Sequence, residues 1–163
     1  MNPLLWKNEL GIRLGFFFGI LLIMSLWELL APRRLLTTSK ITRWSSNLGL
    51  VLIDSIMVRL VFPTALAGIA LIAQQRGWGL FNQFELLYLL KIIFSILILD
   101  FVIYLQHIMF HVIPLLWRLH MVHHTDMDID VTTGIRFHPI EIILSMGIKM
   151  ITVTLMGTPR WPF

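Results

Sequence analysis

Residues 100–141 read DFVIYLQHIMFHVIPLLWRLHMVHHTDMDIDVTTGIRFHPIE and contain all six histidines of the 163-residue chain. Five of these histidines form an H-x-x-x-H pair and an H-x-x-H-H triplet: His107 and His111, then His120, His123 and His124. Successive residues of an α-helix turn by about 100°, so the members of each group lie on one helical face. Neutral imidazole is a good ligand for iron, zinc and copper. The spacing therefore predicts two histidine-bearing helical faces that meet at a metal.

The composition of the chain is that of a membrane protein. Hydrophobic residues make up 57% and charged residues only 13%, and the mean hydropathy is +0.82. Chains this apolar, with long uncharged runs, have a bilayer as their solvent. The net charge of +4 does not indicate nucleic-acid binding, because the basic residues sit between and at the ends of apolar segments. The chain has no cysteine, which excludes disulfides, iron–sulfur clusters and thiolate metal sites.

Four apolar stretches predict an all-α membrane protein with about four transmembrane or interfacial helices: 11–30, 48–73, 84–106 and 140–156. The first is interpreted as a retained helix rather than a cleaved leader. The fourth is marginal in length, so it is either a span or a re-entrant or interfacial helix. We expect a single domain in two parts. Residues 1–99 carry N-terminal transmembrane helices, and residues 100–163 carry the histidine-rich region with the fourth apolar helix.

The distribution of basic residues predicts how the chain is oriented. Four basic residues lie between the first and second stretches, namely Arg33, Arg34, Lys40 and Arg43. One, Arg76, lies between the second and third stretches. The positive-inside rule places the first loop, and with it the histidine region, in the cytoplasm. The second stretch also contains Asp54 and Arg59. These two charges mark either a functional site or, as the commoner case, a pairing between helices or side chains that reach the membrane surface.

Residues close to the histidines are candidates for holding the ligand imidazoles in place. Asp100 and Tyr104 fall on the same stripe as His107. Pro114 suits the first turn of a new helix, which would carry the triplet. Farther along, FHPIE contains a proline suited to a helix start, followed by an acidic residue for its first turn. His138 and Glu141 in this segment are therefore assigned either to the neighbourhood of the metal or to the start of the helix.

Three alternating aspartates, Asp126, Asp128 and Asp130, have the spacing of a calcium-binding loop. Val131 occupies the position where that loop needs glycine, and Phe137 the position where it needs glutamate, so a calcium site is rejected. We expect a solvated acidic loop, or one paired with an arginine at position 118 or 136.

Residues 100–141 resemble the core of the fatty acid hydroxylase/sterol desaturase superfamily of membrane di-iron enzymes. The matching motifs, in order, are D-x-x-x-Y-x-x-H-x-x-x-H ending at His111, P-x-L-W-x-x-H-x-x-H-H ending at His124, and T-x-x-R-x-H-P-x-E ending at Glu141. The likeness is tight over this stretch and loose over the flanking apolar spans. One departure is Ile108, where members of the family often have arginine.

The resemblance implies two irons, held by histidines on the cytoplasmic side of a helical bundle. They would activate O₂ to hydroxylate or desaturate a lipid C–H bond in lipid biosynthesis, with electrons from a redox partner. By position, the histidine pair and triplet are the iron ligands. The possible second-layer partners are Asp100, Tyr104, His138 and Glu141. No catalytic residue separate from the metal site is predicted.

Members of the superfamily have a further H-x-x-H-H segment after the fourth apolar stretch, whereas this chain ends at GTPRWPF. We therefore interpret the chain as C-terminally incomplete and expect it to hold at most about one metal and to lack turnover. The main alternative is a non-catalytic membrane protein with a partial metal site or none. A single-metal hydrolase or a haem protein is a further alternative.

Overall fold

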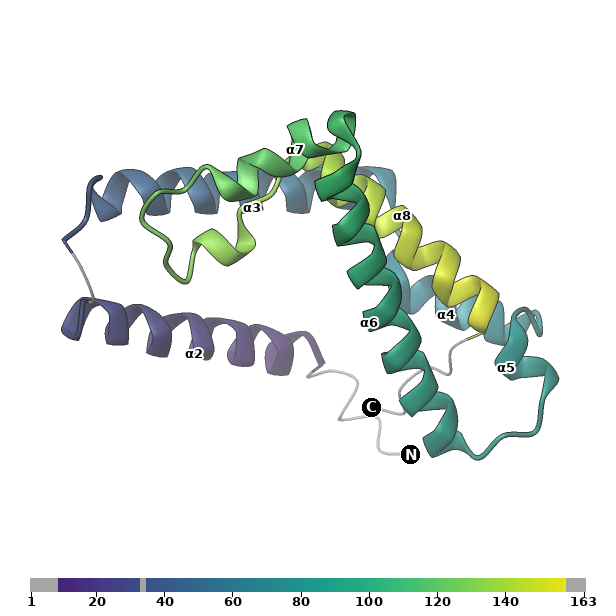
Figure 1. The fold of residues 1–163 in the computed structure, drawn as a ribbon. Helices are drawn as coiled ribbons and strands as arrows, with labels where there is room; N and C mark the ends of the chain where they lie inside the picture. The colour runs from purple at the N-terminus through teal and green to yellow at the C-terminus, as the bar shows by residue number, and fades with distance from the viewer. Residues whose placement is uncertain (1–8, 33–34, 158–163) are drawn as a thin grey trace.

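The computed structural model describes residues 9–32 and 35–157, and its regular elements are all helical (Figure 1). In chain order they are α2 (Glu9–Leu30), α3 (Lys40–Val61), α4 (Ala65–Gln75), α5 (Leu80–Gln83), α6 (Tyr88–Val112), α7 (Pro114–His124), the 3₁₀ turn η1 (Thr133–Ile135) and α8 (Pro139–Met156). The all-α fold class is confirmed. Residues 1–8, the basic residues 33 and 34, and residues 158–163 lie outside the described residues.

The second predicted span, 48–73, lies within a segment long and apolar enough to cross a membrane, but two helices form it instead of one. Helix α3 ends at Val61 and α4 begins at Ala65, with Phe62 in a non-helical conformation at φ −126° and ψ 73°. Pro63 explains the break, because it has no N–H to donate and it disfavours a helical conformation at the preceding residue. Helix α3 also begins earlier than predicted, at Lys40, so part of the predicted basic loop is helical.

Helix α8 is the centre of the packing: it contacts α3, α4 and α6, while α7 lies against both α6 and α8. Pro139 occupies its first turn and Gly157 ends it in a left-handed conformation at φ 63°. Glycine is also required at position 79, where an added Cβ would collide with the backbone of Gly157. Helix α8 therefore has a defined start at Pro139 and a defined end at Gly157.

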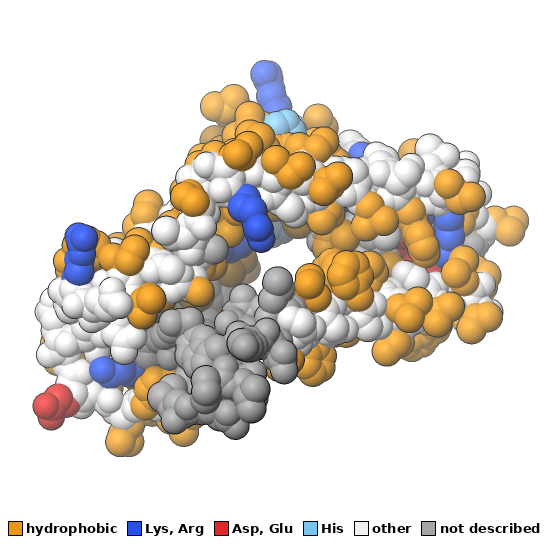
Figure 2. All heavy atoms as spheres, turned by 180° about the vertical axis from the view of Figure 1, so that it is seen from behind, with side chains coloured by type: hydrophobic (Ala, Val, Ile, Leu, Met, Phe, Trp, Pro, Cys, Tyr) orange, Lys and Arg blue, Asp and Glu red, His pale blue; other side chains and the backbone are white. Residues whose placement is uncertain are grey.

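Among the described residues, three segments are long and apolar enough to cross a membrane: Lys40–Gln83, which includes the break after α3, Tyr88–Val112 and Pro139–Met156. A shorter apolar helix covers Leu14–Leu30. Most large apolar side chains of these helices are exposed, and Figure 2 shows them spread over the surface with few charged groups between them. Such a surface suits lipid rather than water. The chain is a multi-pass membrane protein.

The interior of the described part is unusually polar, because buried polar and charged residues outnumber buried apolar ones. Asp54 is one of them, at 7% exposure, whereas Arg59 on the same helix is exposed. No ion pair joins these two residues within the described part of the chain. The two charges therefore do not pair with each other, and their assignment to a functional site, to a pairing between helices or to side chains that reach the membrane surface stays a prediction. The buried polar groups gather instead around α7 and the loop that follows it.

Candidate metal centre

The histidine pair on α6 and the triplet on α7 face each other. Val112 ends α6, Ile113 is extended, and Pro114 starts α7 in a new direction, as the sequence predicts. The ring centroids of His107 and His120 are 4.8 Å apart, and those of His111 and His120 are also 4.8 Å apart. The structure thus brings the pair together with His120 of the triplet, while the ligand role of all five histidines stays a prediction.

Two pairs of ring nitrogens have the spacing of neighbouring ligands of a metal ion. The Nε2 atoms of His107 and His111 are 3.1 Å apart, and those of His120 and His124 are 3.3 Å apart. Metal–nitrogen bonds of about 2.1 Å put neighbouring ligands about 3.0 Å apart at right angles and about 3.4 Å apart at tetrahedral angles. The ligand atoms of His107, His111 and His120 all lie within 4.8 Å of one another. These three residues form a group able to hold a metal.

Glu141 fixes the tautomer of His120. Its Oε1 lies 2.7 Å from Nδ1 of His120, and both side chains are buried, at 5% and 1% exposure. An ionised carboxylate only accepts hydrogen bonds, so Nδ1 of His120 carries the proton and Nε2 keeps its lone pair. This lone pair is directed at the other imidazoles. A carboxylate behind a histidine in this way is the arrangement that orients many metal ligands.

His123 stands at the side of the group. Its ring stacks on Phe137 at 4.7 Å with an interplanar angle of 2°, and its Nδ1 lies 3.2 Å from the carbonyl oxygen of Arg136. A carbonyl only accepts, so Nδ1 donates and Nε2 is left as the free ligand atom. This is the same tautomer as in His120. Its predicted role as a ligand stays a prediction.

The other predicted neighbours of the metal are placed differently. His138 caps α8, where its Nδ1 accepts from the Ile140 N–H at 3.2 Å. Asp100 and Tyr104 are exposed, and no hydrogen bond joins either of them to a histidine in the described part of the chain. Their role in orienting ligands stays a prediction. Of the four candidates, only Glu141 contacts an imidazole of the pair or triplet directly.

The electrostatic environment favours the neutral form of His120 and His124. Burial lowers the pKa of His120, and the neighbouring His111 and His123 lower it further. Burial also lowers the pKa of His124, with repulsion from the surrounding histidines as the second cause. A neutral imidazole is the form that binds metal, because protonation removes the lone pair.

The acidic loop after α7 is wrongly predicted as solvated or paired with Arg118 or Arg136. Asp126 instead accepts from Arg43 at 2.9 and 3.0 Å, and Asp130 accepts from Trp44 Nε1 at 2.9 Å. Burial raises the pKa of Asp126, but hydrogen bonds from Thr133, Arg43 and Asn47 outweigh this and lower it overall. The carboxylates are buried because their partners on α3, more than eighty residues earlier, supply donors. No sequence pattern singles out these partners.

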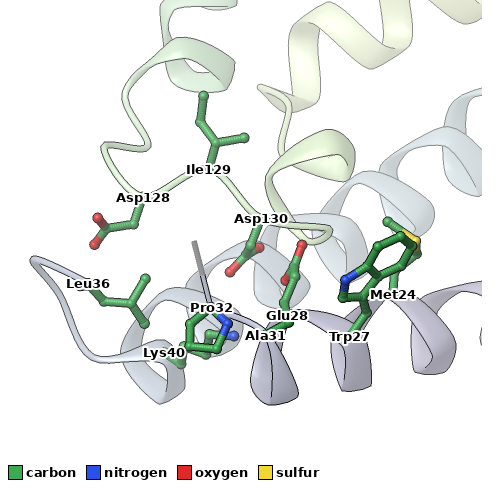
Figure 3. A pocket seen from close by; sticks show the side chains of 10 residues that line it. All are labelled: Met24, Trp27, Glu28, Ala31, Pro32, Leu36, Lys40, Asp128, Ile129 and Asp130. Carbon is green, nitrogen blue, oxygen red and sulfur yellow. The ribbon is translucent and has the colours of Figure 1, made fainter. Parts of the chain in front are cut away.

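Two cavities lie beside this loop. One of about 340 Å³ is lined by His123, His124, Asp126 and Thr133, among others, so it borders the triplet directly. A larger one of about 600 Å³ lies between the end of α2, the start of α3 and the loop, and no histidine lines it (Figure 3). Of these two cavities, only the smaller one is lined by histidines of the triplet.

A comparison with protein families matches residues 92–163 to the family described as fatty acid hydroxylase. These residues form a fatty acid hydroxylase domain. The match contains both histidine groups, Glu141 and the whole of α8, and it leaves out α2 to α5. No curated protein and no solved structure matches the chain. The hydroxylase domain thus carries the metal-binding group, while the earlier helices lie outside the match.

Proposed function

We propose that the hydroxylase domain is the metal-binding part of an iron-dependent membrane oxidoreductase that hydroxylates or desaturates a lipid C–H bond. The observation that carries the proposal is the convergence of His107, His111 and His120, inside a region that matches the fatty acid hydroxylase family. Five imidazoles and no thiolate make a nitrogen-rich donor set, which suits iron. The substrate is a membrane lipid, and a redox partner supplies the electrons.

The residues of the chain have separate roles in this proposal. His107, His111, His120 and His124 would hold the metal, with His123 as a further ligand at the side. When bound, iron supplies the activation of O₂ for attack on an unreactive C–H bond. Glu141 keeps His120 in the tautomer that exposes its Nε2 lone pair. The exposed edges of His107 and His111 leave one side of the group open, which fits the access that O₂ and a lipid chain need.

The histidine region faces the cytoplasm in this proposal. Its support is the excess of basic residues between the first two apolar stretches, although the structure puts Lys40 and Arg43 within α3 rather than in a loop. Arg43 is also buried in an ion pair and so contributes little to a surface charge. The cytoplasm contains the reductants that a redox partner would draw on.

A second candidate function is a non-catalytic membrane protein that keeps one metal. It is favoured by the size of the group: the three residues whose ligand atoms converge within 4.8 Å provide ligands for one ion rather than two. The two candidates make the same metal prediction and differ in turnover.

The test uses the chain in lipid nanodiscs, loaded with Fe²⁺ and washed. We expect about one iron per chain, and the formation of ¹⁸O-labelled or desaturated lipid after addition of ¹⁸O₂ and a reductant decides between the two candidates. His111→Ala should lose the bound iron and, with it, any lipid product. The control is Met109→Ala. Met109 points about 200° away from His107 on the same helix, so this change should alter neither the bound iron nor the lipid product. Bound iron without any lipid product would leave the second candidate, and a wild-type chain without iron would refute both.

A further inference from the structure

The polar side chains at the start of α3 hold the loop that joins the triplet to α8. Arg43 donates from Nε and Nη2 to the two carboxylate oxygens of Asp126, at 2.9 and 3.0 Å, and its Nη2 also lies 3.1 Å from Asp130. Asn47, which is fully buried, donates to Thr132 at 2.9 Å and more weakly to Asp126 at 3.3 Å. Two residues separated by one helical turn thus hold both ends of the acidic loop.

The same two residues connect to the histidines by a short path. Asp126 comes two residues after His124. At the other end of the loop, Arg136 donates from Nη1 to the amide oxygen of Asn47 at 3.2 Å, while its backbone carbonyl accepts from Nδ1 of His123 at 3.2 Å. A shift of Asn47 or Arg43 would therefore move the acceptor that sets the ring orientation of His123.

Two further anchors hold the outer side of the loop. Asp128 accepts from the backbone N–H groups of Thr37 and Thr38 and from the Thr37 hydroxyl, at 2.8 to 2.9 Å. The Val131 N–H donates to Glu28 near the end of α2 at 2.9 Å. The loop thereby forms one wall of the larger cavity, as Figure 3 shows with Asp128 and Glu28 among its labelled side chains.

The energetics favour positioning over stabilisation as the purpose of this network. Arg43 and its carboxylate partners have only 4% to 6% of their side-chain surface exposed. Removing such charges from water costs about as much free energy as their attraction returns, and well-packed apolar residues in their place are often as stable or more so. Directional hydrogen bonds, in contrast, fix one geometry of the loop.

We propose that Arg43 and Asn47 are positioning residues of the metal centre, which act through Asp126 and Arg136 on His123 and His124. The inference rests on the metal-binding part of the proposed function. Arg43 and Asn47 lie outside the region that matches the hydroxylase family, so the earlier helices supply part of the support for the centre. The partners that orient metal ligands typically change metal affinity by about tenfold to hundredfold when they are replaced.

The test measures Co²⁺ binding by the whole chain in nanodiscs, through the visible absorption of the bound ion and a competition titration. We expect Arg43→Met to weaken binding by about tenfold to hundredfold and to change the shape of the absorption band. The control is Arg59→Met, the same change at an exposed position on the same helix, which should bind like the wild type. A purely structural role would change the thermal unfolding of the metal-free protein but not the band of the folded, loaded protein.

A double substitution tests whether the effect of Arg43 on the metal passes through His123. In a chain that already carries His123→Ala, Arg43→Met should cost less affinity than it does alone, because part of its effect passes through His123. If Arg43→Met prevents folding, Asn47→Ala replaces it, since this change spares the Arg43–Asp126 pair. Wild-type affinity and an unchanged band in the folded variant would overturn the inference alone. No Co²⁺ binding by the wild type would overturn both this inference and the proposed metal centre.

Discussion

Replacement of Glu141 tests whether the carboxylate behind His120 sets the metal affinity. Two variants separate its charge from its ability to accept a hydrogen bond. Glu141→Gln keeps an acceptor for Nδ1 of His120 and loses the negative charge, whereas Glu141→Leu loses both. The contact is 2.7 Å long and its two side chains are 1% and 5% exposed, so water cannot readily replace the lost partner.

The magnitude follows from the strength of the contact. A hydrogen bond to a charged group contributes about 1.5 to 3 kcal/mol. A change of 1.4 kcal/mol corresponds to about a tenfold change in affinity. We therefore expect Glu141→Gln to weaken Co²⁺ or Zn²⁺ binding by about tenfold and Glu141→Leu by about a hundredfold, within the range known for partners of metal ligands.

The assay is a competition titration against a metal indicator, with the protein in nanodiscs. Glu85→Gln and Glu85→Leu are the matched controls, because Glu85 is an exposed acidic residue before α6 and should not affect binding. Thermal unfolding of the metal-free variants establishes that each is folded. Binding by Glu141→Leu as tight as that of the wild type would show that the carboxylate does not prepare His120 for a metal.

Three further predictions use the same protein. Replacing both His123 and His124 with alanine should remove most of the bound metal, by at least about a hundredfold in affinity, measured by the same titration. Burial lowers the pKa of His120 below its ordinary value of 6.5, so metal affinity and the free energy of unfolding should both hold above pH 6.5. The free energy of unfolding should decrease below pH 6.5, because the unfolded chain then takes up more protons than the folded one. Metal affinity should decrease at a lower pH, where the folded imidazoles themselves become protonated. A pH series of melting curves and titrations measures the two. A cysteine introduced at Met127, which is 72% exposed in the loop after α7, should react with an impermeant thiol reagent only from the cytoplasmic side, and labelling only from outside would reverse the predicted orientation.

The helices and the convergence of the histidines could be predicted from the sequence, because both depend on short-range rules. Apolar length predicts a membrane helix, the 100° turn puts His107 and His111 on one face, and Pro114 redirects the chain so that the triplet returns toward them. The break at Pro63 was within reach of the same rules, yet the apolar run around it was interpreted as one span.

Only the tertiary structure decided what surrounds the histidines. Glu141 and His138 are close neighbours in the sequence and were equal candidates, but one contacts His120 and the other caps α8. The aspartates after α7 have the composition of a solvated loop, and they are buried because Arg43 and Asn47 reach them from α3. Hydrogen-bond partners this distant leave no periodic pattern in the sequence. A buried charge is stable only where a partner meets it in space, and the packing of α3 and α8 determines that position.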